Sequence, residues 1–297
     1  MRRPSLACFL AIGSFSAISS AFAADIEYGL DFSAERAHQV FKDSSADLDT
    51  VALQPYLQVD NWSFTLDVPW QRAKGEVFIN DNFQPSPKYL TKILSKCDTY
   101  AAATPAQRQW LAKRFPNITN VLNTQCQNTA QTDNEVSGLS DVTGFVHYSM
   151  PLDEQGIWLG SIGLGYKADN GDADNGLGSG TSDAKLEGSL SAMFGMFTGT
   201  VTLGYDWVVG GSEADYVDNS TYASLDLSVK PKSWLILGAN WNYQQAYVSG
   251  FDDVQSVSGY VTVKPLDKLK LRVYYKNYLS VENYPDHEVG GGVSYSF

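Results

Sequence analysis

A histidine and a serine, His147 and Ser149, stand two residues apart in the stretch "GFVHYSM", so on a strand they would share one face. Hydrolases use such a pair to activate a nucleophile, with an acidic residue that orients the imidazole. The sequence spacing alone does not identify an acidic residue that would orient His147. We therefore expect a polar histidine on an inner surface, and a hydrolase acting on lipid or peptide is the alternative.

Metal ligands give two further candidate groups. His38 and His287 would meet if the first and last strands adjoin, as a metal site or an acid–base pair. Asp43, Asp286 and Glu288 lie nearby. The stretch 169–176, "DNGDADNG", carries three aspartates but lacks the frame and final glutamate of a calcium loop. We expect a polar rim and a flexible exposed loop at these places, with no metal and no cofactor.

Cys97 and Cys126 are the two cysteines beyond the N-terminal segment, and an even count in an exported chain predicts one disulfide. Three stretches with helical spacing surround them: 86–97, 104–115 and 117–126. A bridge across this span would stabilise the segment by roughly 3–4 kcal/mol. Residues 71–136 are therefore predicted to be a disulfide-stapled helical insertion in an extracellular loop.

The insertion is also basic. Between Gln84 and Thr132 it has one acid, Asp98, and six bases: Lys88, Lys92, Lys96, Arg108, Lys113 and Arg114. Its net charge of +5 contrasts with the rest of the chain, which is strongly acidic. Three readings stay open: a cap that gates or narrows a pore, a surface that docks lipid or a partner, and an inert insertion. Either of the first two predicts sensitivity to salt.

The elements that must position these residues are strands. Twelve segments alternate apolar and polar residues over roughly ten positions, the length that a tilted membrane strand needs. They are 26–32, 51–59, 62–70, 142–150, 158–166, 184–192, 199–207, 221–229, 235–243, 257–263, 269–275 and 289–297. Short turns at 60–61, 151–156, 195–196, 230–233 and 265–268 alternate with longer polar links. This pattern predicts an all-β, transmembrane antiparallel β-barrel of about 12 strands, with both termini in the periplasm.

The alternation assigns side chains to two faces. Aromatic residues near strand ends would face lipid at the membrane interfaces: Trp62, Trp70, Trp158, Trp207, Trp241 and Tyr243. Polar residues would line the lumen: Asp67, Asp141, His147, Lys185, Glu187, Asp206, Asp226, Asn240, Asn242, Lys270, Arg272 and Lys276. The basic strand 269–275 against Asp206 and Asp226 suggests a field across the lumen. Local pairing of these charges is the alternative.

Both ends of the chain indicate export to the outer membrane of a Gram-negative bacterium. Residues 1–23 carry Arg2 and Arg3, an apolar run and a small-residue cleavage site, as a signal peptide does. The remaining 24–297 then hold 19 basic and 33 acidic residues, a net charge of −14, which argues against nucleic acid as a partner. Val293, Tyr295 and Phe297 share one face of the last strand and resemble the signal read by the barrel-assembly machinery. That machinery and outer-membrane lipid are the expected partners.

Two stretches, 137–150 and 164–191, carry a family pattern. Gly138, Leu139 and Asp141 form its first element, and the second is a glycine-rich loop with Gly171-Asp172, "GLGSG" at 176–180, Thr181 and Asp183. With the closing "GGGVSYSF", these residues resemble the outer-membrane family named for the MetA pathway of phenol degradation, over about 137–297. The resemblance implies a barrel and transport of small, often hydrophobic or aromatic compounds, and it brings no catalytic residues.

The sequence thus predicts a porin-like channel for passive passage of small molecules through the outer membrane, and no enzyme. A hydrolase and a surface adhesin or receptor are the alternatives. Pore conductance would favour the channel. Loss of an activity on His147→Ala or His38→Ala would favour the hydrolase, and binding that survives pore blockage would favour the adhesin or receptor.

Overall fold

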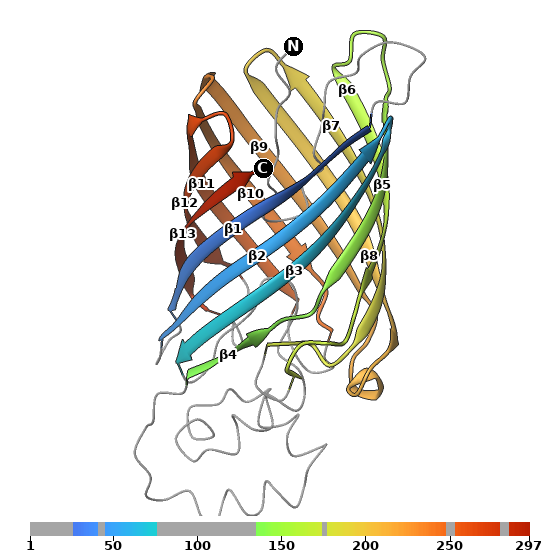
Figure 1. Ribbon diagram of the computed structural model, residues 1–297, viewed down its shortest axis with the longest axis vertical. Coiled ribbons are helices and arrows are strands. Elements are labelled where there is room, and N and C mark those ends of the chain that lie inside the picture. The colour runs from blue at the N-terminus through green and yellow to red at the C-terminus, as the bar shows by residue number, and fades with distance from the viewer. Residues whose placement is uncertain (1–25, 41–44, 76–134, 174–176, 248–252, 280–284) are drawn as a thin grey trace, which may run out of the picture.

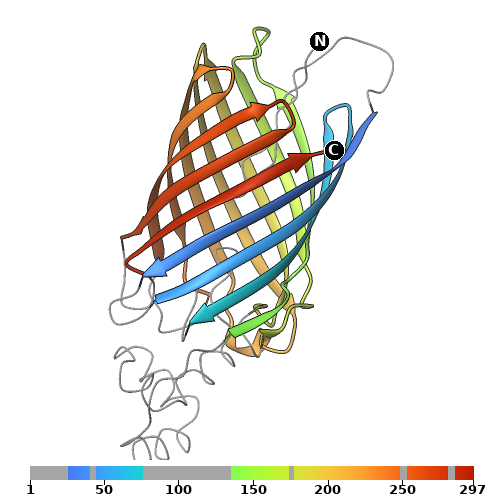
Figure 2. The same cartoon turned by 60° about the vertical axis from the view of Figure 1, so that its left-hand side comes forward.

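The described residues of the chain form one antiparallel sheet closed into a barrel (Figures 1 and 2). The computed structural model describes residues 26–40, 45–75, 135–173, 177–247, 253–279 and 285–297. Its strands are β1 (Ile26–Val40), β2 (Ser45–Val59), β3 (Trp62–Gly75), β4 (Glu135–Leu139), β5 (Thr143–Pro151), β6 (Trp158–Lys167), β7 (Ser182–Phe194), β8 (Phe197–Gly210), β9 (Ser220–Lys232), β10 (Leu235–Gln244), β11 (Val254–Leu266), β12 (Leu269–Tyr278) and β13 (His287–Ser296).

The barrel closes where β1 pairs with β13, from Asp31 opposite Ser296 to Val40 opposite His287. Every other strand pairs with its neighbours in chain order, except that β4 and β5 share one edge of β3. The thirteen strands therefore occupy twelve positions, and the prediction of a 12-stranded antiparallel barrel is confirmed.

The sequence missed a break in the strand at the fourth position. β4 and β5 are separated by Ser140–Val142, next to a point where β3 carries Pro69, a residue without an N–H. At this break, the Ser140 N–H donates a backbone hydrogen bond to the Pro69 carbonyl of β3 at 2.9 Å. The interruption turns Asp141 into the barrel, where it is buried.

The outer surface of the barrel is apolar. Large hydrophobic side chains are exposed at alternate positions, as on β3 (Trp62, Phe64, Leu66 and Trp70) and β6 (Trp158, Ile162, Leu164 and Tyr166). A closed barrel satisfies every strand edge, and an apolar outer band is what lipid requires. The protein is therefore an outer-membrane barrel. Among the described residues, no helix has the length and apolarity to cross a membrane.

Some predicted boundaries need correction. β3 continues to Gly75 and β4 begins at Glu135, so the first five and last two residues of the predicted insertion 71–136 belong to strands. β9 runs to Lys232, which shortens the predicted turn at 230–233. The signal peptide, the three helices, the cysteines 97 and 126 and the six bases of the predicted cap all lie outside the described residues.

The two ends of the barrel differ. The short turns gather at the end drawn at the top of Figure 1, and the longer links β6–β7 and β8–β9 lie at the other end, where β3 ends and β4 begins. We call them the short-turn end and the long-loop end. The extensions of β1–β4 towards the long-loop end carry outward charges that pair across strands, such as Arg72 with Glu135 at 2.9 Å. The wall therefore continues beyond the apolar band into a polar environment.

Candidate functional site: the inner wall and the long-loop end

Six inward rings of the described residues lie across glycines of neighbouring strands, and a Cβ added at any of these glycines would overlap the ring. The pairs are Tyr56 over Gly29, Phe145 over Gly165, His147 over Gly163, Tyr222 over Gly204, Tyr260 over Gly238 and Tyr274 over Gly290. Only glycine leaves this room. The rings therefore cover the wall instead of projecting across the lumen.

Three of these tyrosines, Tyr222, Tyr260 and Tyr274, reach past their glycines to a carboxylate on the strand beyond. The Tyr222 hydroxyl donates to Glu187 Oε2 at 2.7 Å. The Tyr260 hydroxyl donates to Asp226 at 3.1 Å. The repeated geometry fixes acidic side chains along the inner wall by neutral donors, which leaves their charge facing the interior.

His147 is held by an acid that the sequence spacing could not identify. Its Nε2 lies 2.8 Å from Glu187 Oε1, and its ring stacks on Phe145 with 5.3 Å between centroids. Among the described residues, no hydrogen bond joins Ser149 to His147. The described part of the chain thus contains the His147–Glu187 pair of a hydrolase triad. It does not show a serine hydrogen-bonded to His147.

The predicted lumen charges lie on the inner wall and pair locally. Lys185 Nζ is 3.0 Å from Asp206 Oδ1, and Lys276 Nζ is 3.3 Å from Glu288 Oε1. Asp67 accepts a hydrogen bond of 3.0 Å from Gln54. Asp206 thus has its own lysine, so the suggested field between β12 and this aspartate is replaced by neighbour-to-neighbour pairing.

The remaining predicted wall residues are also placed. Asn240, Asp226 and Lys270 are buried on the inner face, and Asn242 is partly covered there. The guanidinium of Arg272 lies over the ring of Tyr260, 4.0 Å from its centroid. Trp62, Trp70, Trp158 and Trp207 are exposed on the outer face, as are Tyr295 and Phe297 of the last strand.

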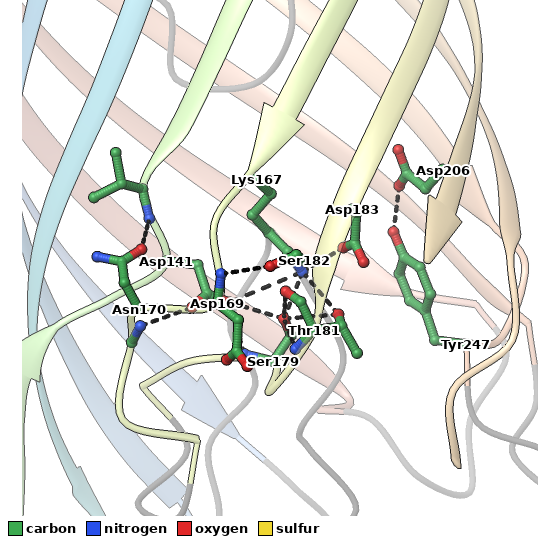
Figure 3. Close-up of polar contacts among 12 residues, drawn as sticks. Asp141, Lys167, Asp169, Asn170, Ser179, Thr181, Ser182, Asp183, Asp206 and Tyr247 are labelled. Atoms are coloured by element: carbon green, nitrogen blue, oxygen red, sulfur yellow. Dashed lines mark hydrogen bonds and ion pairs between the residues drawn. The ribbon is translucent and has the colours of Figure 1, made fainter. Parts of the chain in front are cut away.

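The loop between β6 and β7 folds into the long-loop end instead of standing free (Figure 3). Asp141 accepts hydrogen bonds from the Gly171 N–H at 2.9 Å and from the N–H and hydroxyl of Ser179 at 2.7 and 2.8 Å. Asn170 Oδ1 accepts the Val142 N–H at 2.9 Å. Within the predicted exposed stretch 169–176, Asn170 and Asp172 are exposed and Ala173 is buried. The residues that follow it, Leu177, Ser179 and Thr181, are buried.

Lys167, the last residue of β6, also contacts this loop. It is 3% exposed, and its Nζ lies 2.5 Å from both Asp183 Oδ2 and the Ser179 hydroxyl. The sequence analysis missed Lys167 and Asp183 as site residues. The alternation could have identified both, because each lies one position beyond the predicted end of its strand. At that position the side chain faces inward.

An apolar contact brings the loop to the opposite part of the mouth. Leu177 is 1% exposed and belongs to a cluster of buried side chains. The other members come from β1, β2 and β3, with Val136 of β4 packed beside them: Ala37, Ala46, Leu48 and Ala73. A single leucine in a polar, glycine-rich stretch was the signal for this contact.

A second segment closes over the wall next to this loop. Tyr247 follows β10, is buried, and donates its hydroxyl to Asp206 Oδ2 (Figure 3). Burial and the charge of Asp206 hold the pKa of Tyr247 well above 10, so its hydroxyl keeps the proton that it donates. The Glu213 N–H also bonds the Gly180 carbonyl at 2.8 Å, which ties the β8–β9 link, with its single turn η2 (Ala214–Tyr216), to the loop.

The candidate metal ligands do not converge. His38 and His287 lie on the outer face, where His38 Nδ1 is 2.8 Å from Asp47 and the ring of His287 stacks on Tyr275. Asp169 Oδ2 accepts the Ser212 N–H at 3.1 Å. Within the described residues, no group of three or more His, Cys, Asp or Glu could hold a metal ion; Asp43 and Asp174 lie outside them.

Comparison with known proteins places the fold. No family model matches the chain, and no curated protein matches it. A solved outer membrane channel from Pseudomonas putida F1 is 12% identical, with a TM-score of 0.59 over 95% of this chain and 100% of that one. The NanC porin is 11% identical, with a TM-score of 0.51 over 90% and 100%. At these identities the likeness shows a shared barrel fold.

Proposed function

We propose that this protein is an outer-membrane channel for the passive passage of small molecules. The observation that carries the proposal is a closed barrel with a polar, charged inner wall whose rings lie flat across glycines. The shared fold with a channel and a porin supports it. A wall of carboxylates, lysines and hydroxyls favours small polar solutes over the hydrophobic compounds that the family resemblance suggests.

The β6–β7 loop is proposed to narrow the outer mouth. Long loops of such barrels face the exterior and short turns face the periplasm, which makes the long-loop end extracellular. The bonds from Asp141 and the packing of Leu177 hold the loop across this end. The basic insertion, whose bases and cysteines lie outside the described residues, remains part of the proposal as a cap on the same side.

Single-channel conductance of the refolded mature chain in a planar bilayer tests the proposal. Discrete, reproducible current steps are expected, and heat-modifiable mobility on a gel establishes that the barrel is folded. A folded barrel that gives no current steps, and whose proteoliposomes take up no small polar solute, refutes the channel.

An outer-membrane hydrolase is the second candidate, because Glu187 supplies the acid that orients His147. Hydrolysis of a fluorogenic short-chain ester by the folded barrel, abolished in His147→Ala, would favour it. The channel is preferred because, among the described residues, Ser149 makes no hydrogen bond to His147.

A further inference from the structure

Two carboxylates of the inner wall are held by side chains other than lysine and arginine. Asp67 accepts a hydrogen bond of 3.0 Å from the amide of Gln54. Glu187 accepts one from the Tyr222 hydroxyl at 2.7 Å, and its other oxygen lies 2.8 Å from the His147 ring. Within the described ranges, the ion pairs of the wall lysines are with other acids. No bonded lysine or arginine of the described wall therefore cancels the charge of either carboxylate.

These two carboxylates lie at about the same height in the barrel. Ser63 of β3 is opposite His147, which is opposite Gly163, which is opposite Glu187. With strands tilted by about 40°, each of these three steps descends about 3 Å towards the long-loop end. Asp67 lies four residues beyond Ser63 in the same direction, at about 2.5 Å of height per residue. Both routes descend about 10 Å from Ser63.

The outer face at this height lies between two bands of aromatic side chains. The exposed rings are Trp62 and Trp158 nearer the short-turn end, and Trp70 and Tyr166 nearer the long-loop end. Asp67 is between the two rings on β3, and Gly163, opposite Glu187, is between the two on β6. Such bands mark the edges of the hydrocarbon layer. The wall behind both carboxylates is therefore backed by lipid, and a low-dielectric wall concentrates the field of its charges in the lumen.

Most other inward charges in this part of the wall have a neighbour of opposite sign. The pairs are Asp226 with Arg272, Asp31 with Lys270, Asp206 with Lys185 and Glu288 with Lys276. The charges within each pair offset each other. Asp67 and Glu187 therefore give the middle of the described wall a net negative charge.

The charges nearer the two ends do not reverse this sign. Towards the long-loop end, Glu35 adds a further acid, which the Tyr274 hydroxyl bonds at 2.6 Å. At the short-turn end, Lys230 and Lys264 continue the inward positions of β9 and β11 close to the turns. Charges at a rim face the bulk electrolyte, which screens them over about 8 Å. Their effect on an ion in the middle of the barrel is therefore weaker than that of Asp67 and Glu187.

We propose that Asp67 and Glu187 make the channel selective for small cations, both inorganic ions and solutes with one ammonium group. The two carboxylates act through the field in the lumen, so they need no direct contact with the passing ion. Carboxylates around a pore select cations in the same way in other channels. The selectivity rests on the proposed channel function, since the field acts only on solutes that enter the lumen.

The reversal potential of single channels in a gradient of dilute KCl tests the selectivity. The measurement is made at pH 8, where imidazole is ordinarily neutral. Two charges about 8 Å from the barrel axis, screened over about 8 Å, should favour potassium over chloride by about fourfold in permeability. Asp67→Asn and Glu187→Gln should each lower this ratio to about twofold, and the double variant should bring it close to one. In about 1 M KCl the wild-type ratio should also approach one, because the screening length falls to about 3 Å.

Glu135→Gln is the matched control, because it removes the same charge from the outer face, where Glu135 pairs with Arg72. It should keep the wild-type ratio. If Glu187→Gln does not fold, Gln54→Lys provides a second test, because it sets a cation beside Asp67 and should lower the ratio without removing a carboxylate. A wild-type ratio of one or less, an unchanged ratio in the variants, or an equal fall in Glu135→Gln overturns the selectivity and leaves the channel standing. A folded barrel without current and without solute uptake overturns the channel itself.

Discussion

Replacing Asp141 by asparagine should release the β6–β7 loop from the mouth. The carboxylate accepts three hydrogen bonds from the loop, at 2.7, 2.8 and 2.9 Å, and lies 3.9 Å from Lys167 Nζ. An asparagine keeps one acceptor oxygen and turns an NH₂ group towards an N–H of Gly171 or Ser179. Whichever way the amide points, one donor faces another donor.

The size of the effect follows from these bonds. Hydrogen bonds to a charged group contribute about 1.5–3 kcal/mol, and neutral ones about 1. Losing one charged bond and weakening the others destabilises the anchored loop by about 3 kcal/mol, which corresponds to roughly a hundredfold in the ratio of released to anchored states.

Two assays report this change. Hydrogen exchange of the amides of Gly171 and Ser179, followed by mass spectrometry of peptides from the loop, should accelerate by roughly that factor. Single-channel conductance should rise or flicker. Asp226→Asn is the control, because it removes the same charge from the inner wall on β9, at a site bonded by Tyr260. Unchanged exchange in Asp141→Asn, or an equal rise of conductance in Asp226→Asn, would refute the anchoring role.

Three further predictions follow from the wall and the loop. Gly204→Ala puts a Cβ into the ring of Tyr222 and should lower the thermal unfolding midpoint of the folded barrel by the equivalent of about 1–3 kcal/mol, whereas Gly259→Ala, with open space at its Cβ, should not. Lys167→Met leaves the fully buried Asp183 without its cation and should cost about 3–5 kcal/mol; the double variant Lys167→Met/Asp183→Asn should recover most of it, and a failure to recover would contradict the pairing. Reduction of the predicted disulfide between Cys97 and Cys126 should raise the conductance, and a Cys97→Ser/Cys126→Ser variant should show the raised value without a reductant; identical currents before and after reduction would exclude the cap as a constriction.

The strands could be predicted because lipid outside and polar groups inside impose a period of two on every segment. That period also assigned Asp67, His147, Glu187 and Lys276 to the inner face. It could not show their partners, because a pair such as Lys185 and Asp206 depends on which residues stand opposite one another on β7 and β8. Hydrophobic period alone does not fix that register.

The inward loop was missed for a different reason. Its composition is that of an exposed link, and what folds it inward is distant in sequence: the carboxylate of Asp141 and the apolar cluster around Ala37 and Leu48. The break in the strand at Ser140–Val142, which aims Asp141 at the loop, leaves no trace in the alternation pattern. Only the three-dimensional placement of β4, β5 and β6 connects these features.

The pairs of ring and glycine also act against misassembly. A strand that slips by two residues keeps its apolar face towards lipid, so hydrophobicity does not penalise that error. Such a slip of β9 against β8 would bring Tyr222 opposite Thr202 or Asp206 instead of Gly204, where a side chain occupies the place of the ring. Tyr260 with Gly238 and Tyr274 with Gly290 repeat this check at two other seams. The residues that keep the lumen wall flat thereby also determine which strand alignment the folding chain accepts.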